Sequence, residues 1–142
     1  DHAAALAVME KIIEIKPDNA AALNFVGYSW AEKKINLDQA LEYIQRAIEL
    51  KPENGFIRDS LGWVFFRLGK LDQAVKELEI AVRLSPDDAG ILDHLGDAYL
   101  ENGRARDALQ TYKKALKHAS EDGQEKNRIQ EKIRILEKQG TY

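Results

Sequence analysis

The chain has 142 residues, of which 44% are hydrophobic and 32% charged, a balance that suits a folded protein with a sizeable core. Its formal net charge of −3 argues against nucleic acid as a partner, because non-specific binding to phosphates needs clustered lysine and arginine. The absence of cysteine excludes a disulfide framework and a zinc site built on thiolates.

Proline, glycine and Asp or Asn residues divide the chain into short segments with helical periodicity. No segment shows the period-two alternation that indicates a strand. The pattern therefore predicts an all-α chain, with helices over residues 2–15, 20–34, 37–50, 54–68, 71–84, 88–102, 105–118 and 122–139.

Small residues recur along this series of helices at a nearly constant interval. Gly27, Gly62 and Gly96 are 35 and 34 residues apart. Alanines at 40, 74 and 108 repeat at intervals of 34 and 34. This period indicates a stacked array of helix-turn-helix units. Each glycine costs roughly 1 kcal/mol of helix propensity, so we expect it at the closest approach of two paired helices.

The spaced residues resemble the tetratricopeptide repeat, which joins Leu-Gly-x-x-aromatic to Ala-x-x-x-Phe and then a closing Ala and Pro. Three copies follow in register: Val26-Gly27-x-x-Trp30 with Ala40-x-x-x-Ile44, Leu61-Gly62-x-x-Phe65 with Ala74-x-x-x-Leu78, and Leu95-Gly96-x-x-Tyr99 with Ala108-x-x-x-Tyr112. The resemblance implies a right-handed helix-turn-helix solenoid, the superhelix of this family. It divides a single domain, residues 1–142, into a half repeat (1–18), three repeats (19–53, 54–87 and 88–120) and a C-terminal capping helix (121–142).

Two places depart from a regular array. The first copy has one extra residue, which we expect within residues 31–34, and Asn36 is available for its turn. The last helix carries Ile129, Ile133 and Leu136 on one side, which predicts a helix that covers the third repeat and exposes its other face. A coiled-coil arm is the alternative interpretation of that stripe.

In arrays of this family the first helix of each pair lines a concave groove. The resemblance assigns to this groove twelve side chains, rich in aromatic and acidic residues: Asn24, Phe25, Tyr28, Phe56, Asp59, Ser60, Trp63, Phe66, Arg67, Asp93, His94 and Asp97. Aromatic residues are typical anchors of binding surfaces, so they favour a role in partner binding. The alternative is that these rings only fill the contact between neighbouring first helices.

The groove residues predict a scaffold or adaptor that binds a protein or peptide. With Arg67 as its clear basic member, the acidic lining favours a basic or amphipathic segment. The family's clamp of Lys, Asn and Arg for a C-terminal carboxylate is absent here, because the matching positions hold residues such as Asp59, Asp93 and Asp97. The alternative function is self-assembly by stacking through the open ends of the solenoid. The N-terminal end favours a homo-oligomer, because Leu6, Met9, Ile12 and Ile13 recur at helical spacing and only some of them can pack on the next helix, which leaves an apolar strip.

Nothing in the sequence indicates an enzyme. It contains no Gly-rich phosphate loop, nucleophile elbow or paired zinc motif, so we expect neither a cofactor nor a metal. His94 with Asp93 and Asp97 offers too few ligands for a metal site. No apolar run approaches the ~18 residues of a membrane span.

The absence of cysteine suits both the cytoplasm and the periplasm. The two pentapeptides that begin at Asp59 and Asp93 resemble the last repeats of bacterial cell-envelope members of the family. That resemblance favours the periplasm or an envelope-associated location, with the cytoplasm as the alternative.

Overall fold

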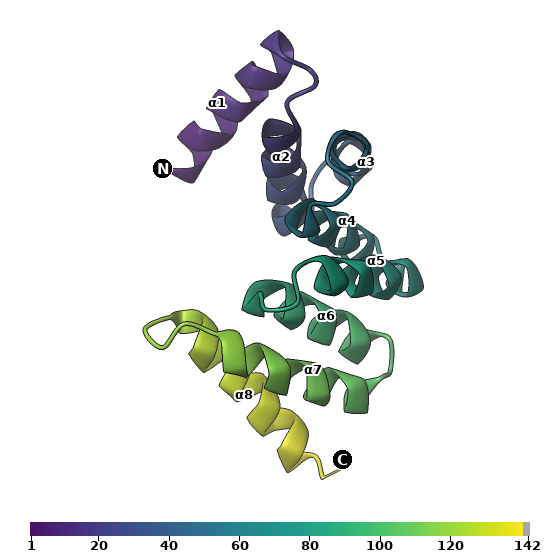
Figure 1. The fold of residues 1–142 in the computed structure, drawn as a ribbon, viewed down its shortest axis with the longest axis vertical. Coiled ribbons are helices and arrows are strands. Elements are labelled where there is room, and N and C mark those ends of the chain that lie inside the picture. The colour runs from purple at the N-terminus through teal and green to yellow at the C-terminus, as the bar shows by residue number, and fades with distance from the viewer. Residues whose placement is uncertain (141–142) are drawn as a thin grey trace.

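The computed structural model describes residues 1–140, which form eight α-helices and no strand (Figure 1). Every helix lies within two residues of its predicted bounds. Residues 141 and 142 of the predicted capping segment lie outside the described part of the chain. The helices are α1 (His2–Ile15), α2 (Ala20–Lys33), α3 (Leu37–Leu50), α4 (Gly55–Arg67), α5 (Leu71–Leu84), α6 (Ala89–Glu101), α7 (Ala105–His118) and α8 (Gln124–Lys138).

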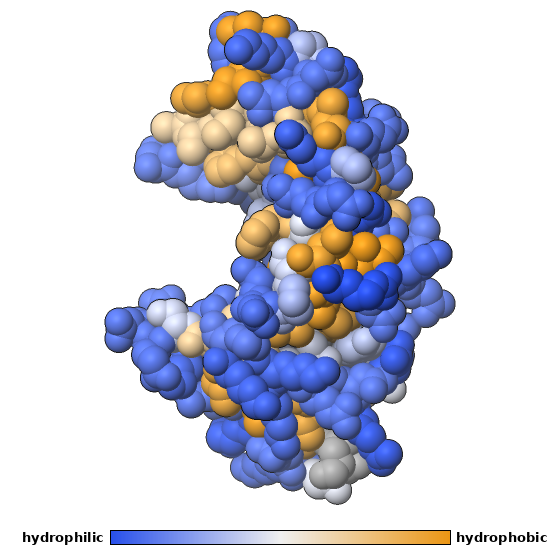
Figure 2. Space-filling view, in the orientation of Figure 1, coloured by the Kyte–Doolittle hydropathy of each residue, from blue (hydrophilic) through white to orange (hydrophobic). Residues whose placement is uncertain are grey.

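Successive helices pack as antiparallel pairs that stack along one axis, from α1 at one end to α8 at the other (Figure 1). We call α2–α3, α4–α5 and α6–α7 the first, second and third helix pairs. The first helices also touch one another, α2 against α4 and α4 against α6. The space-filling view shows the molecule hollowed on one side, between the N-terminal helices and α8 (Figure 2). The chain is thus an all-α helix-turn-helix solenoid.

The repeated glycines mark the closest approach within each pair, as predicted. A Cβ atom built on Gly27 would lie 2.6 Å from Ile44 Cδ1, and one on Gly62 would lie 2.5 Å from Leu78 Cγ. On Gly96 it would lie 2.3 Å from a ring carbon of Tyr112. These distances leave no room for a methyl group. The close packing that glycine permits therefore offsets its lower helix propensity.

Side-chain caps fix the starts of the three first helices. Asn19 Oδ1 accepts the Ala22 N–H at 3.0 Å, at the start of α2. Asn54 and Asp88 accept amide hydrogens in the same way at the starts of α4 and α6. Each cap satisfies backbone donors that the first turn of a helix leaves unpaired.

The extra residue of the first pair lies after Lys34, not within residues 31–34. The Ile35 N–H donates to the Trp30 carbonyl at 3.0 Å, which closes the end of α2. The same bond closes the equivalent turns, from Lys70 to Phe65 and from Arg104 to Tyr99. Ile35 therefore matches Lys70 and Arg104, and Asn36 is the inserted residue. It adopts a left-handed φ of 48°, which asparagine tolerates better than most residues.

The two end helices differ in how much surface they bury. α8 buries the predicted stripe of Ile129, Ile133 and Leu136. α1 has no buried residue, although Leu6, Met9 and Ile13 pack against the core. No helix within residues 1–140 combines the length and apolar character needed to cross a membrane.

Candidate partner-binding groove

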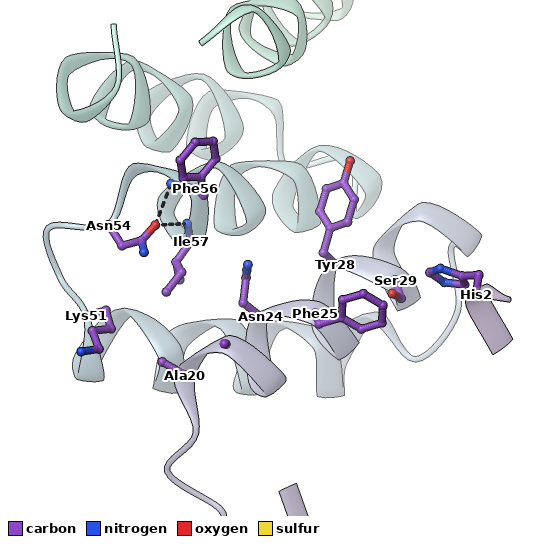
Figure 3. A pocket seen from close by; sticks show the side chains of 11 residues that line it. His2, Ala20, Asn24, Phe25, Tyr28, Ser29, Lys51, Asn54, Phe56 and Ile57 are labelled. Atoms are coloured by element: carbon purple, nitrogen blue, oxygen red, sulfur yellow. Dashed lines mark hydrogen bonds between the residues drawn. The ribbon is translucent and has the colours of Figure 1, made fainter. Parts of the chain in front are cut away.

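A cavity lies at the N-terminal end of the concave face (Figure 3). It has a volume of about 630 Å³ and lies between α1, α2, the start of α4 and the loop before α4. Four of the predicted groove residues line it: Asn24, Phe25, Tyr28 and Phe56. His2, Ser29, Lys51 and Asn54 complete its polar lining.

Three aromatic rings in this cavity remain accessible. Phe56 is 55% exposed, whereas Phe25 and Tyr28 are half-buried. Phe25 stacks on His2 with ring centroids 5.6 Å apart, which joins α1 to α2. Burial, and then the charge and hydrogen bond of Glu32, raise the pKa of Tyr28, so its phenol stays neutral.

Asn24 supplies the polar centre of the cavity. Its side chain extends from α2 toward α4, below Phe56 (Figure 3). Its Oδ1 atom is buried and has no hydrogen-bond partner among the described residues. A buried acceptor without a partner carries a desolvation cost of roughly 1–3 kcal/mol, so a ligand that donates to it would recover that free energy.

The aromatic residues further along the face form a closed stack. Trp63 lies between Phe66 at 4.6 Å and the His94 ring at 4.1 Å, measured between centroids. It is 8% exposed, so it is not an open surface of the groove. For Trp63 the structure matches the alternative given above, in which rings fill the contact between neighbouring first helices.

The acidic residues of this half are also engaged within the chain. Asp59 is buried, and its Oδ1 lies 2.9 Å from His94 Nδ1. Burial lowers the pKa of His94, but the charge and hydrogen bond of Asp59, with Asp93 and Asp97 beyond, outweigh it and raise that pKa. Ser60 is buried as well and donates to the Phe56 carbonyl at 3.1 Å.

Two basic residues of α8 neutralise the remaining carboxylates. Arg128 Nη2 donates to Asp93 Oδ2 at 3.1 Å, and Lys132 Nζ donates to Asp93 Oδ1 at 2.7 Å. Lys132 also donates to Asp97 at 2.9 Å, and the Tyr112 hydroxyl donates to Asp97 at 2.5 Å. The acidic residues of this half are therefore paired within the chain. Arg67 is not the only basic residue of the face.

Sequence reasoning missed Arg128 and Lys132 because α8 was interpreted only through its apolar stripe. The repeat period contained the signal. Arg128 and Lys132 lie 35 residues after Asp93 and Asp97, so α8 continues the register of the first helices. Basic residues one repeat period after acidic ones predict ion pairs between the two helices.

Arg67 lies at the edge of the groove and has a structural contact. Its Nε donates to the Ala31 carbonyl at 2.9 Å, and its Nη2 donates to the Glu32 carbonyl at 2.7 Å. Both acceptors belong to the last turn of α2, where carbonyl groups lack helical partners. Arg67 therefore ties the end of α4 to the end of α2.

The titratable residues do not assemble into a metal site. Among residues 1–140, no three His, Cys, Asp or Glu side chains come close enough together to hold a metal ion. His94 directs its Nδ1 to Asp59.

Similar proteins share this architecture. TTC0263, a thermophilic TPR protein in Thermus thermophilus, superposes with a TM-score of 0.77 and 25% identity, over 91% of this chain and 71% of that one. MamA 41-end from Desulfovibrio magneticus RS-1 gives a TM-score of 0.71 over 87% of this chain and 70% of that one, and its 20% identity shows the fold alone.

One curated relative is also similar in sequence. The TPR repeat-containing protein PA4667 of Pseudomonas aeruginosa is 44% identical over 70 residues, or 46% of this chain. The matched part spans only 12% of the length of that relative. A profile of the tetratricopeptide repeat matches residues 1–55 and 60–123 of the present chain, which is more than half of it. The chain therefore belongs to the tetratricopeptide repeat family.

Proposed function

We propose that the chain binds a partner polypeptide at the N-terminal half of its groove, with an apolar side chain of the partner in the cavity of about 630 Å³. The observation that carries this proposal is the combination, in one cavity, of accessible aromatic rings and the unpartnered Oδ1 of Asn24. Concave apolar sites with a few convergent polar groups are the usual places for binding.

The partner segment is amphipathic rather than simply basic. Phe25, Tyr28 and Phe56 offer apolar area to an anchor side chain, and such area dominates the energetics of interfaces. Asn24 Oδ1 accepts a hydrogen bond from a backbone or side-chain donor of the same segment. The acidic residues of the other half add little attraction for a basic segment, because Asp59, Asp93 and Asp97 are already paired within the chain.

Peptides selected from a random library against the intact chain would test this proposal. We expect them to bind Phe56→Ala and Asn24→Ala about 10- to 100-fold more weakly than the wild type, the usual loss at an interface anchor. Leu100→Ala is the matched control, because Leu100 is an exposed apolar residue of α6 that does not line the cavity. Equal affinity for all four proteins would contradict the proposal.

Self-association is a second candidate, favoured by the surface of α1. Leu6, Met9 and Ile13 pack against the core, so the exposed apolar surface of α1 is formed by other residues. Val8 and Ile15 are 57% and 69% exposed. With Ala5 and Ile12 they are spaced by three, four and three residues, which suits pairing with the same helix of a second copy.

The polarity of the two ends selects the kind of assembly. α8 exposes Gln130, Glu131 and Arg134 beside a single large apolar residue, Ile135, so it offers little to the apolar strip of α1. We therefore propose a closed two-fold pair rather than a filament. Val8→Lys with Ile15→Lys should abolish a dimer seen by sedimentation. Lys11→Ala, on the same helix, should not. A wild type that stays monomeric at millimolar concentration excludes this candidate.

A further inference from the structure

His94 lies where α6 meets α4 on the concave face. Its Nδ1 is 2.9 Å from Asp59 Oδ1, and its ring stacks on Trp63 of α4 at 4.1 Å. Its side chain is 18% exposed, and Tyr28 of α2 lies 6.2 Å away between ring centroids. The contact between the second and third helix pairs on this face therefore includes one ionisable ring.

A charge count around the ring shows what its protonation would do. The cluster holds three carboxylates, from Asp59, Asp93 and Asp97, but two permanent cations, Arg128 and Lys132. Both cations contact Asp93 or Asp97, and neither is hydrogen-bonded to Asp59. Protonated His94 is the group in contact with Asp59 that can supply the third positive charge.

We propose that His94 is a proton-operated latch, which holds the second and third helix pairs at a fixed angle when protonated and lets that angle vary when neutral. A neutral ring can still donate from Nδ1 to the Asp59 carboxylate, but the bond then has one ionised partner instead of two and loses the attraction between opposite charges. The consequence for binding rests on the groove function proposed above, since the angle sets the curvature of the groove.

The groups that face His94 from each packed helix agree with this assignment. From α4 comes the carboxylate of Asp59, which favours the protonated ring. From α6 itself come Asp93 and Asp97, which act in the same direction. From α2 comes Tyr28, which stays neutral because its pKa is raised. From α8 come Arg128 and Lys132, whose charges oppose protonation but are offset by Asp93 and Asp97.

The raised pKa of His94 fixes the direction of the pH effect. A group whose folded pKa lies above its unfolded value stabilises the fold fully below that unfolded value, about 6.5 for histidine. The stabilisation is lost as the pH rises through the folded value. The latch is therefore closed in mild acid and opens at higher pH.

Histidine NMR of the intact chain tests the first half of the proposal. The chain has three histidines, so His2 and His118 serve as internal references for the His94 signal. We expect His94 to titrate with a midpoint above about 6.5, and Asp59→Asn to lower that midpoint by at least about one pH unit. Asp59→Asn keeps the shape and an acceptor oxygen while removing the charge. A midpoint at or below the ordinary value, or one that ignores Asp59→Asn, would overturn the proposal.

Spin-label distances test the second half, and the absence of native cysteine makes the labelling clean. Lys76→Cys on α5 and Gln110→Cys on α7 place labels at exposed positions of the second and third pairs. We expect the distance distribution to broaden between about pH 6 and pH 8, and the effect to vanish in His94→Gln. A distribution that stays constant while His94 titrates would overturn the latch. Neither measurement needs a partner, so their outcome is independent of the peptide experiment.

Discussion

The two halves of the concave face use equivalent positions in opposite ways. Asn24, Asp59 and Asp93 occupy the same register of successive first helices, at intervals of 35 and 34. Asn24 borders a cavity and keeps a buried oxygen without a partner, whereas Asp59 and Asp93 are buried and paired. A groove position is thus open or closed according to what the next helix in the array provides.

The aromatic positions repeat this contrast. Tyr28 and Trp63 are also equivalent, 35 residues apart. Tyr28 is half-buried beside the cavity, whereas Trp63 is covered on one side by Phe66 and on the other by His94. The comparison assigns binding to the N-terminal half and cohesion to the C-terminal half, and substitutions can test each assignment.

The largest expected effect belongs to Trp63. Trp63→Ala removes a ring stacked on both sides, so we expect a loss of about 3–5 kcal/mol in the free energy of unfolding. Urea denaturation followed by circular dichroism would measure it. A loss below about 1 kcal/mol, the range of ordinary surface changes, would show that Trp63 is not part of the cohesive half.

Asp93→Asn should come next. This change leaves Lys132 and Arg128 facing a neutral amide, although the half-exposed Arg128 can turn to solvent. We expect a loss of about 2–3 kcal/mol, somewhat less than for a fully buried pair. Glu101→Gln, an exposed change on the same helix, is the control and should lie within about 0.5 kcal/mol of the wild type. Equal stability of the two variants would contradict the assignment of Asp93 to the half of the face that stabilises the fold.

Asn24→Leu should act in the opposite direction. The change removes a buried acceptor that has no partner and adds apolar surface, so we expect a gain of up to about 1 kcal/mol in stability. Thermal unfolding of the free protein would detect it. A clear destabilisation would mean that the Asn24 amide is satisfied in solution, and the open half would then resemble the closed one.

Phe56→Ala should have the smallest effect on stability, within about 0.5 kcal/mol, because most of the ring is already exposed. The same variant should show the largest loss of peptide affinity. Paired measurements of unfolding and binding on one preparation would separate the two effects. A large loss of stability with normal affinity would place Phe56 in the cohesive half instead.

The helices were predictable because their boundaries are encoded locally. Prolines, capping residues such as Asn19 and Asn54, and the glycines of the repeat each act within a few residues or at a fixed period. The inserted residue was misplaced because Lys34 adopts the left-handed conformation that glycine takes in the later turns. A lysine gives no sequence signal for that geometry.

The candidate site was less predictable, because exposure depends on neighbours that are distant in sequence. The register identified which residues lie on the concave face, but not that Asp59 pairs with a histidine 35 residues later. Nor did it show that α8 fills the far end with two cations. Alternating charges along a polar helix are usually solvent-exposed. The local sequence therefore did not distinguish Arg128 and Lys132 from surface charges.

The join between α8 and the third helix pair makes the repeats alike in shape but not interchangeable. Lys132 and Arg128 need acids at positions 93 and 97, and the second pair offers Asp59 and Trp63 there instead. In a longer array built by duplicating the third pair, α8 would still pack against a pair that carries both acids. An array shortened by deleting the third pair would set a lysine against a tryptophan. The side chains of α8 therefore determine which helix pair can precede it.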